Sequence, residues 1–267
     1  MPTIQRNGES FQVADTGAGP PLLLVHGFPL AHAMWAAQIK ALSHDHRVIA
    51  PDLRGFGDSV VTPGTVTMAR MADDLAGLLD ELSVDGAVAF VGFSMGGYVG
   101  WEFLRRHRER VASLVLCDTR VIADTPDAAA GRLKLAERVE AEGVEVAVQA
   151  MLPKLLAADQ ADGIPNLADT VATMIRRSDP RGIAAALRGM AERRDSRDLL
   201  SGLADLPVLV IVGEHDAIST AEEMAGLAAL IPGASFRRIA RAGHTTPMEA
   251  PDAVSEALNS FLGAPIR

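Results

Sequence analysis

Residues 88–97 read VAFVGFSMGG, and this stretch determines which fold we expect. The apolar run 88–91 is typical of a strand that is buried on both faces. Apolar residues at three- and four-residue spacing follow the stretch as far as His107, which predicts a helix. A G-x-S-x-G pattern between a strand and a helix predicts a sharp turn that holds the hydroxyl of Ser94 clear of the backbone. Glycines suit such a turn because the helix and the strand approach too closely for Cβ atoms.

Short apolar runs alternate with helical stretches on both sides of this turn. The further predicted strands are residues 22–26, 47–51, 87–92, 111–117, 208–213 and 235–240, with an entry hairpin formed by residues 3–6 and 11–16. The predicted helices between them are residues 35–42, 67–82, 95–107, 220–230 and 252–262. This alternation predicts an α/β fold with a mostly parallel central sheet and helices on both of its faces.

The alternation is interrupted once, because about ninety residues separate the strand ending near Cys117 from the strand beginning at Val208. Pro126 marks the start of a helix and Gly143 its end. The further helical segments of the insertion are residues 144–156, 167–177 and 179–194. We therefore predict a core domain formed by residues 1–119 and 206–267, and a helical cap formed by residues 120–205.

Composition narrows the class of protein and its partners. The chain has 267 residues, of which 48% are hydrophobic and 22% are charged, as in ordinary globular proteins. A net charge of −9 argues against nucleic acid as a partner. Cys117 is the single cysteine and cannot form an internal disulfide, and no apolar run approaches the roughly 18 residues that a membrane span needs. We expect a cytoplasmic protein with no membrane partner, and the sequence carries no signal for its oligomeric state.

The chemistry of a serine nucleophile requires two further groups. A serine hydroxyl is weakly nucleophilic at neutral pH, so a base must accept its proton and an acid must orient that base. The predicted strand 208–213 is followed by Glu214-His215-Asp216, and the next strand is followed by Ala242-Gly243-His244. Both segments stand at the carboxyl ends of parallel strands, where open α/β sheets place their sites.

The sequence resembles the α/β-hydrolase superfamily from Leu22 to Leu262. The matching motifs are His26-Gly27-Phe28-Pro29, the stretch DLRGFGDS at residues 52–59, the serine turn, Gly213-Glu214-His215-Asp216, and Gly243-His244 with Glu249 and Pro251 downstream. The resemblance implies a triad in which Ser94 is the nucleophile, Asp216 the acid and His244 the base. Asp118 is the alternative acid, because some hydrolases of this fold use the position after the strand ending at Cys117.

The resemblance also implies an oxyanion hole formed by the backbone N–H groups of Phe28 and Met95. The candidate substrate-pocket residues are apolar and lie near the expected site, although core packing is the alternative for each. They are Leu30, Met151, Leu152 and Leu155. The sequence contains no His-Glu-x-x-His motif, no Cys/His cluster, no Walker lysine and no dinucleotide pattern, so we expect neither a metal site nor a cofactor.

These residues predict a serine hydrolase that cleaves carboxylic esters of small to medium acyl compounds through an acyl-enzyme. An enol-lactone hydrolase is the runner-up, because Cys117-Asp118-Thr119 and the helix from Pro126 resemble that group's cap entry. A cofactor-free perhydrolase or a carbon–carbon bond hydrolase would use the same triad. Epoxide hydrolases are disfavoured, since they need an aspartate where this chain has Ser94. A non-catalytic hydrolase-fold receptor is the alternative from a different class.

Overall fold

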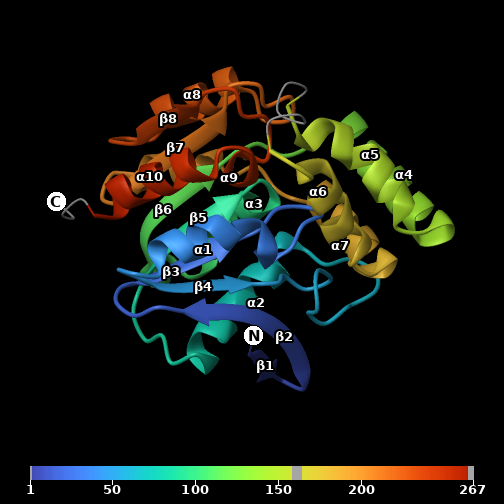
Figure 1. The fold of residues 1–267 in the computed structure, drawn as a ribbon, viewed down its shortest axis with the longest axis horizontal. Coiled ribbons are helices and arrows are strands. Elements are labelled where there is room, and N and C mark those ends of the chain that lie inside the picture. The colour runs from blue at the N-terminus through green and yellow to red at the C-terminus, as the bar shows by residue number, and fades with distance from the viewer. Residues whose placement is uncertain (1, 158–163, 264–267) are drawn as a thin grey trace.

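The computed structural model describes residues 2–157 and 164–263, and its centre is one eight-stranded sheet (Figure 1). The strand order across the sheet is β1-β2-β4-β3-β5-β6-β7-β8. The strands β1 and β2 pair antiparallel, β2 pairs antiparallel with β4, and the other neighbours are parallel. The strands are β1 (Thr3–Arg6), β2 (Glu9–Thr16), β3 (Pro21–Val25), β4 (Arg47–Pro51), β5 (Val88–Phe93), β6 (Val111–Cys117), β7 (Val208–Gly213) and β8 (Ser235–Ile239). The predicted fold class is confirmed.

Helices cover both faces of this sheet. On one face α1 packs against α10, and on the other α2 packs against α3 (Figure 1). The helices that follow core strands are α1 (Ala36–Leu42), α2 (Met68–Glu81), α3 (Met95–Arg106), α8 (Ala221–Leu230) and α10 (Pro251–Leu262). The sequence pattern did not reveal α9 (Thr246–Glu249) or the 3-10 turns at His32–Trp35, Arg108–Arg110 and Arg197–Leu203. Segments of three to seven residues are too short to show a hydrophobic period.

The insertion between β6 and β7 contains four helices in its described part. They are α4 (Pro126–Glu142), α5 (Glu145–Leu155), α6 (Leu167–Arg176) and α7 (Pro180–Ala191). The side chain of Thr125 caps α4, and Gly143 ends it with a left-handed φ of 94°. The helix α7 approaches the core closely, because a Cβ added at Gly182 or at Gly55 would overlap the backbone of the other residue. Residues 158–163 and 264–267 of the predicted domains lie outside the described residues.

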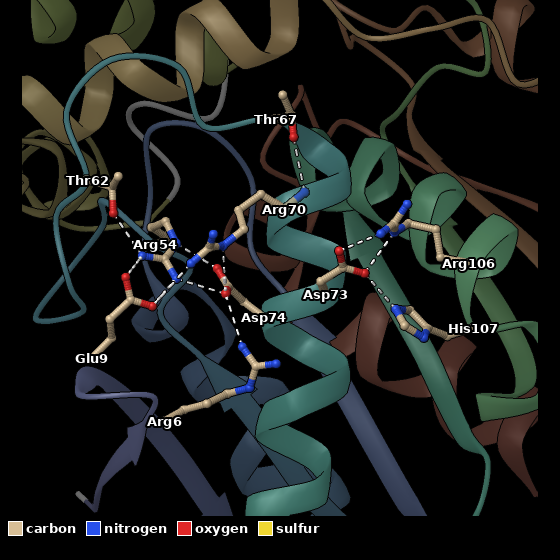
Figure 2. A network of polar contacts seen from close by, with 10 residues as sticks. All are labelled: Arg6, Glu9, Arg54, Thr62, Thr67, Arg70, Asp73, Asp74, Arg106 and His107. Atoms are coloured by element: carbon tan, nitrogen blue, oxygen red, sulfur yellow. Dashed lines mark hydrogen bonds and ion pairs between the residues drawn. The ribbon is translucent and has the colours of Figure 1, made fainter.

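A buried ion-pair network ties the entry hairpin to the core (Figure 2). The side chain of Arg54 is 1% exposed and pairs with Asp74 on α2 at 2.7 Å and with Glu9 on β2 at 2.6 Å. Arg54 follows β4, so this one guanidinium joins three elements that are distant in the sequence. Removing either partner would leave a buried charge less well compensated, which is strongly destabilising.

In the described residues, no helix is long and apolar enough to span a membrane.

Candidate active site

Ser94 lies in the sharp turn between β5 and α3. Its backbone has φ 51° and ψ −113°, a conformation that a non-glycine residue adopts only where the surroundings enforce it. The Ser94 N–H donates to the carbonyl of Cys117 at 2.9 Å, and the Ser94 carbonyl accepts from the N–H of Gly97 at 2.9 Å. A Cβ added at Gly92 would lie 2.5 Å from the carbonyl oxygen of Gly96, which explains why glycines flank this serine.

Three buried side chains from separate strand ends meet at this turn. His244 Nε2 lies 2.9 Å from Ser94 Oγ, and His244 Nδ1 lies 2.8 Å from Asp216 Oδ2. The other carboxylate oxygen of Asp216 accepts the N–H groups of Ile218 at 2.7 Å and Ser219 at 3.0 Å, so the acid is held in place. An imidazole whose Nδ1 faces a carboxylate carries its proton there, which leaves Nε2 free to accept the serine proton.

The alternative acid Asp118 lies close by but bonds to other groups. Its Oδ1 accepts the N–H of Gly213 at 2.9 Å, and its Oδ2 accepts the hydroxyl of Thr246. Burial, followed by repulsion from the Asp216 carboxylate, raises the pKa of Asp118 well above its usual range. The carboxylate oxygen that hydrogen-bonds His244 belongs to Asp216 and not to Asp118.

Glu249 organises the loop that carries His244. This carboxylate is buried and accepts every one of its hydrogen bonds. Its Oε2 accepts the N–H groups of Gly243 at 3.0 Å and Ala157 at 2.8 Å, while Oε1 accepts the N–H and hydroxyl of Thr245, each at 2.9 Å. The sequence places Glu249 in a motif but does not indicate this task, because three of its four donors are backbone N–H groups and one of these lies 92 residues away.

The candidate oxyanion donors lie beside the serine turn, one at the start of α3 and one after β3. Within the described residues, neither the Phe28 N–H nor the Met95 N–H donates to a backbone carbonyl. His26 fixes the loop that carries Phe28: its Nε2 accepts the N–H of Leu53 at 2.9 Å, and its Nδ1 donates to the carbonyl of Gly27 at 3.0 Å. Burial lowers the pKa of His26 to about 4, so this brace is neutral at physiological pH.

The predicted pocket residues belong to two segments, the loop after β3 and the helix α5. Leu30 lies two residues after Phe28 and is fully buried. Leu155 ends α5, and its carbonyl accepts both the N–H and the hydroxyl of Thr245 at 3.0 Å, so this helix reaches the neighbour of His244. Met151 and Leu152 lie about one turn earlier on α5 and are half-buried against the core. Among residues 2–157 and 164–263, no three His, Cys, Asp or Glu side chains form a group that could hold a metal ion.

Comparison with known proteins identifies the family. A model for the alpha/beta hydrolase fold matches residues 20–251. The chain belongs to the α/β-hydrolase fold family. Within this family, a solved thermophilic esterase from Thermogutta terrifontis, with malate bound, is 47% identical, has a TM-score of 0.94, and matches over 98% of this chain and 96% of its own. The enol-lactonase from Burkholderia xenovorans LB400 is 29% identical, with a TM-score of 0.90 and coverage of 98% and 100%.

Epoxide hydrolases of the same family match a shorter part of the chain. Epoxide hydrolase 2 from Siraitia grosvenorii is 42% identical over 116 residues, which are 42% of this chain and 36% of that protein. The matches span 36–40% of the length of the three epoxide hydrolases from this plant. The predicted resemblance to the α/β-hydrolases is confirmed.

Proposed function

We propose that this protein is a serine hydrolase that cleaves carboxylic esters, with Ser94 as nucleophile, His244 as general base and Asp216 as the acid that orients it. The observation that carries the proposal is the position of His244, whose two ring nitrogens lie 2.9 Å from Ser94 Oγ and 2.8 Å from Asp216 Oδ2. The similarity over nearly the full chain to a thermophilic esterase supports the same reaction class.

The reaction follows from this geometry. His244 Nε2 takes the proton of Ser94 Oγ as that oxygen attacks the ester carbonyl, and Asp216 stabilises the imidazolium that forms. The N–H groups of Phe28 and Met95 stabilise the negative charge on the carbonyl oxygen of the tetrahedral intermediate. The imidazolium then gives its proton to the leaving alcohol, and an acyl-enzyme remains on Ser94. Water activated by His244 releases the acid through the reverse sequence of proton transfers.

We infer the class of substrate from the insertion between β6 and β7. In this proposal residues 120–205 form a cap on a core made of residues 1–119 and 206–267. Leu30 from the core and Met151, Leu152 and Leu155 from α5 line a pocket for a small or medium acyl group. The hydrogen bonds from Thr245 to the carbonyl of Leu155 support this pocket, because they hold the end of α5 against the loop of His244.

Lactone hydrolysis is the second candidate. A lactone is an internal ester, so its opening would use the same nucleophile, base and oxyanion donors. The similarity to an enol-lactonase along the whole of that chain supports it, although at 29% identity rather than the 47% of the esterase. Perhydrolysis and carbon–carbon bond cleavage would need the same triad, whereas opening an epoxide through an alkyl-enzyme ester would need a carboxylate in place of Ser94.

The proposal predicts covalent labelling at one residue and loss of ester hydrolysis when that residue is changed. A fluorophosphonate probe should label Ser94 in wild type, since His244 activates its hydroxyl. Ser94→Ala should lose both labelling and the hydrolysis of p-nitrophenyl esters, and a parallel panel of lactones ranks the two substrate classes. Labelling at another residue would refute the assignment of the nucleophile. Ligand binding without turnover by folded wild type would favour a receptor instead.

A further inference from the structure

Three consecutive residues at the end of β6 contact all three loops of the candidate triad. On the side of the nucleophile, the carbonyl of Cys117 accepts the Ser94 N–H at 2.9 Å, and Thr119 Oγ1 donates to the Ser94 carbonyl at 2.7 Å. Asp118 lies between these two residues and faces the other two loops. The segment 117–119 is therefore the place where the positions of nucleophile, acid and base can be set relative to one another.

Asp118 bonds to the acid loop and to the base loop at once. Its Oδ1 accepts the N–H of Gly213, which ends β7 three residues before the candidate acid, at 2.9 Å. Its Oδ2 hydrogen-bonds the hydroxyl of Thr246, which lies two residues after the candidate base. Its backbone carbonyl accepts the hydroxyl of Ser219 at 3.2 Å, and the Ser219 N–H donates to Asp216. One fully buried side chain thus spans two loops that are separated in the sequence.

We propose that Asp118 is a positioning residue that holds the acid loop and the base loop in register, so that Asp216 meets His244. The proposal rests on the function proposed above. Asp118 acts through Gly213 and Thr246, since the imidazole takes its only carboxylate partner in the described residues from Asp216. This role differs from that of a second catalytic acid, which would have to face His244 itself.

The environment of Asp118 favours the neutral form of its carboxyl group. The residue is fully buried, and its backbone φ of 48° lies in the left-handed region. Burial, followed by repulsion from Asp216, raises the pKa of Asp118 well above its usual range. Asp118 Oδ1 accepts the N–H of Gly213, and Oδ2 accepts the hydroxyl of Thr246, which can turn to accept a hydrogen bond instead. An asparagine side chain can therefore accept from Gly213 and donate to Thr246, and asparagine also tolerates left-handed backbone better than most residues.

The chemistry of this pair defines the test. Asp118→Asn keeps an acceptor for Gly213, and its NH₂ can donate to the Thr246 hydroxyl once that hydroxyl turns, so its kcat should stay close to that of wild type. Asp118→Leu removes both bonds and should lower kcat by about tenfold to a hundredfold while KM changes little, as expected when reacting groups are misplaced. Thr246→Val keeps Asp118 and breaks only the bond to the base loop, so it should give a smaller loss of kcat and covers the case in which Asp118→Leu does not fold.

Three measurements separate positioning from a general loss of stability. Asp124→Asn removes the charge of another buried carboxyl, paired with Arg132 at 2.6 Å and Arg193 at 2.7 Å, and should lower Tm without lowering kcat per folded molecule. The rate of fluorophosphonate labelling at Ser94 should fall in Asp118→Leu in parallel with kcat. The acidic limb of the kcat/KM profile should be unmoved in Asp118→Asn, because burial favours the neutral form of Asp118 and the amide is neutral as well.

The outcomes distinguish the two proposals. If wild type hydrolyses no ester and Ser94 is not labelled, the proposed function fails. If wild type is active through Ser94 but Asp118→Leu and Thr246→Val keep its kcat, the positioning role fails while the function stands. A loss of activity in Asp118→Asn as large as that in Asp118→Leu, or a shift of its acidic limb, would also overturn the inference, because it would show that Asp118 acts through its charge.

Discussion

Each oxygen of Glu249 accepts at least one backbone N–H, whereas Oδ2 of Asp118 accepts a hydroxyl, although both are buried carboxyl groups. Three N–H groups and one hydroxyl donate to Glu249, so both of its oxygens must remain acceptors. In Glu249→Gln the amide NH₂ faces at least one backbone N–H, whichever way the side chain is turned. We expect the free energy of unfolding to fall by about 2 kcal/mol, with a loss of kcat, because the loop of His244 is released.

Urea unfolding of Glu249→Gln and of Asp118→Asn compares the loss in free energy of unfolding caused by each substitution. Both substitutions replace a buried carboxyl by an amide of the same shape, and only the first forces two donors together. Equal stability of the two variants would show that the acceptor count at Glu249 does not control the base loop.

Asp216→Asn should disable His244 through its tautomer. The N–H groups of Ile218 and Ser219 keep an oxygen at the Oδ1 position, so the new NH₂ must face His244 Nδ1. Nδ1 then has to accept a hydrogen bond, the ring proton moves to Nε2, and Nε2 can no longer take the proton of Ser94. We expect kcat on a p-nitrophenyl ester to fall by about 10³ to 10⁴, with KM little changed. A loss of less than tenfold would place the acid elsewhere.

At the scale of elements, α5 is the part of the insertion that we expect to determine the preference for acyl chain length. Met151 and Leu152 are half-buried on α5, and the helix ends against the loop of His244. Met151→Ala should enlarge the pocket and raise the ratio of kcat/KM for octanoate over butyrate p-nitrophenyl esters. Leu133→Ala is the matched control, since Leu133 lies on α4 of the same insertion with 43% of its surface exposed. If both variants keep the wild-type ratio, α5 does not line the acyl pocket.

The elements themselves were largely predictable from the sequence. The strands Arg47–Pro51, Val111–Cys117 and Val208–Gly213 have the predicted bounds, because buried parallel strands are uninterrupted apolar runs with clear ends. The short helix α9 was missed, since four residues carry no period and its start depends on the bonds that Glu249 makes to the base loop.

At the scale of the whole molecule, the three residues of the proposed triad could be chosen from the sequence, whereas the contacts that hold them could not. Ser94, Asp216 and His244 each follow a recognisable strand, and the resemblance to a known family assigned their roles before their geometry was known. The bonds of Asp118 and Glu249 join residues that lie up to 128 positions apart, and such pairings arise only when the sheet brings strand ends together. Single-sequence patterns report local periodicity, so they contain no signal for these bonds.

The pH dependence of stability provides a last test of this packing, through His26. Burial lowers the pKa of His26 from 6.5 to about 4, so between these values the unfolded chain binds a proton that the folded protein does not. The stability that depends on this histidine is therefore present above pH 6.5 and is lost as the pH falls towards 4. A shift of this size corresponds to about 3 kcal/mol in the free energy of unfolding.

His26→Gln isolates most of this contribution, because glutamine does not titrate, whereas the carboxylates other than Asp52, which interacts with His26, should titrate alike in both chains. Urea unfolding at pH 7.5 and pH 4.5 should show a smaller loss of stability in acid for the variant than for wild type, even if the variant is less stable at pH 7.5. The difference arises because burial disfavours the charged imidazole in the folded protein, where Nε2 also accepts the Leu53 N–H. Equal losses in the two proteins would mean that His26 is protonated as easily in the folded state as in the unfolded chain, and the neutral brace described for the Phe28 loop would then be wrong.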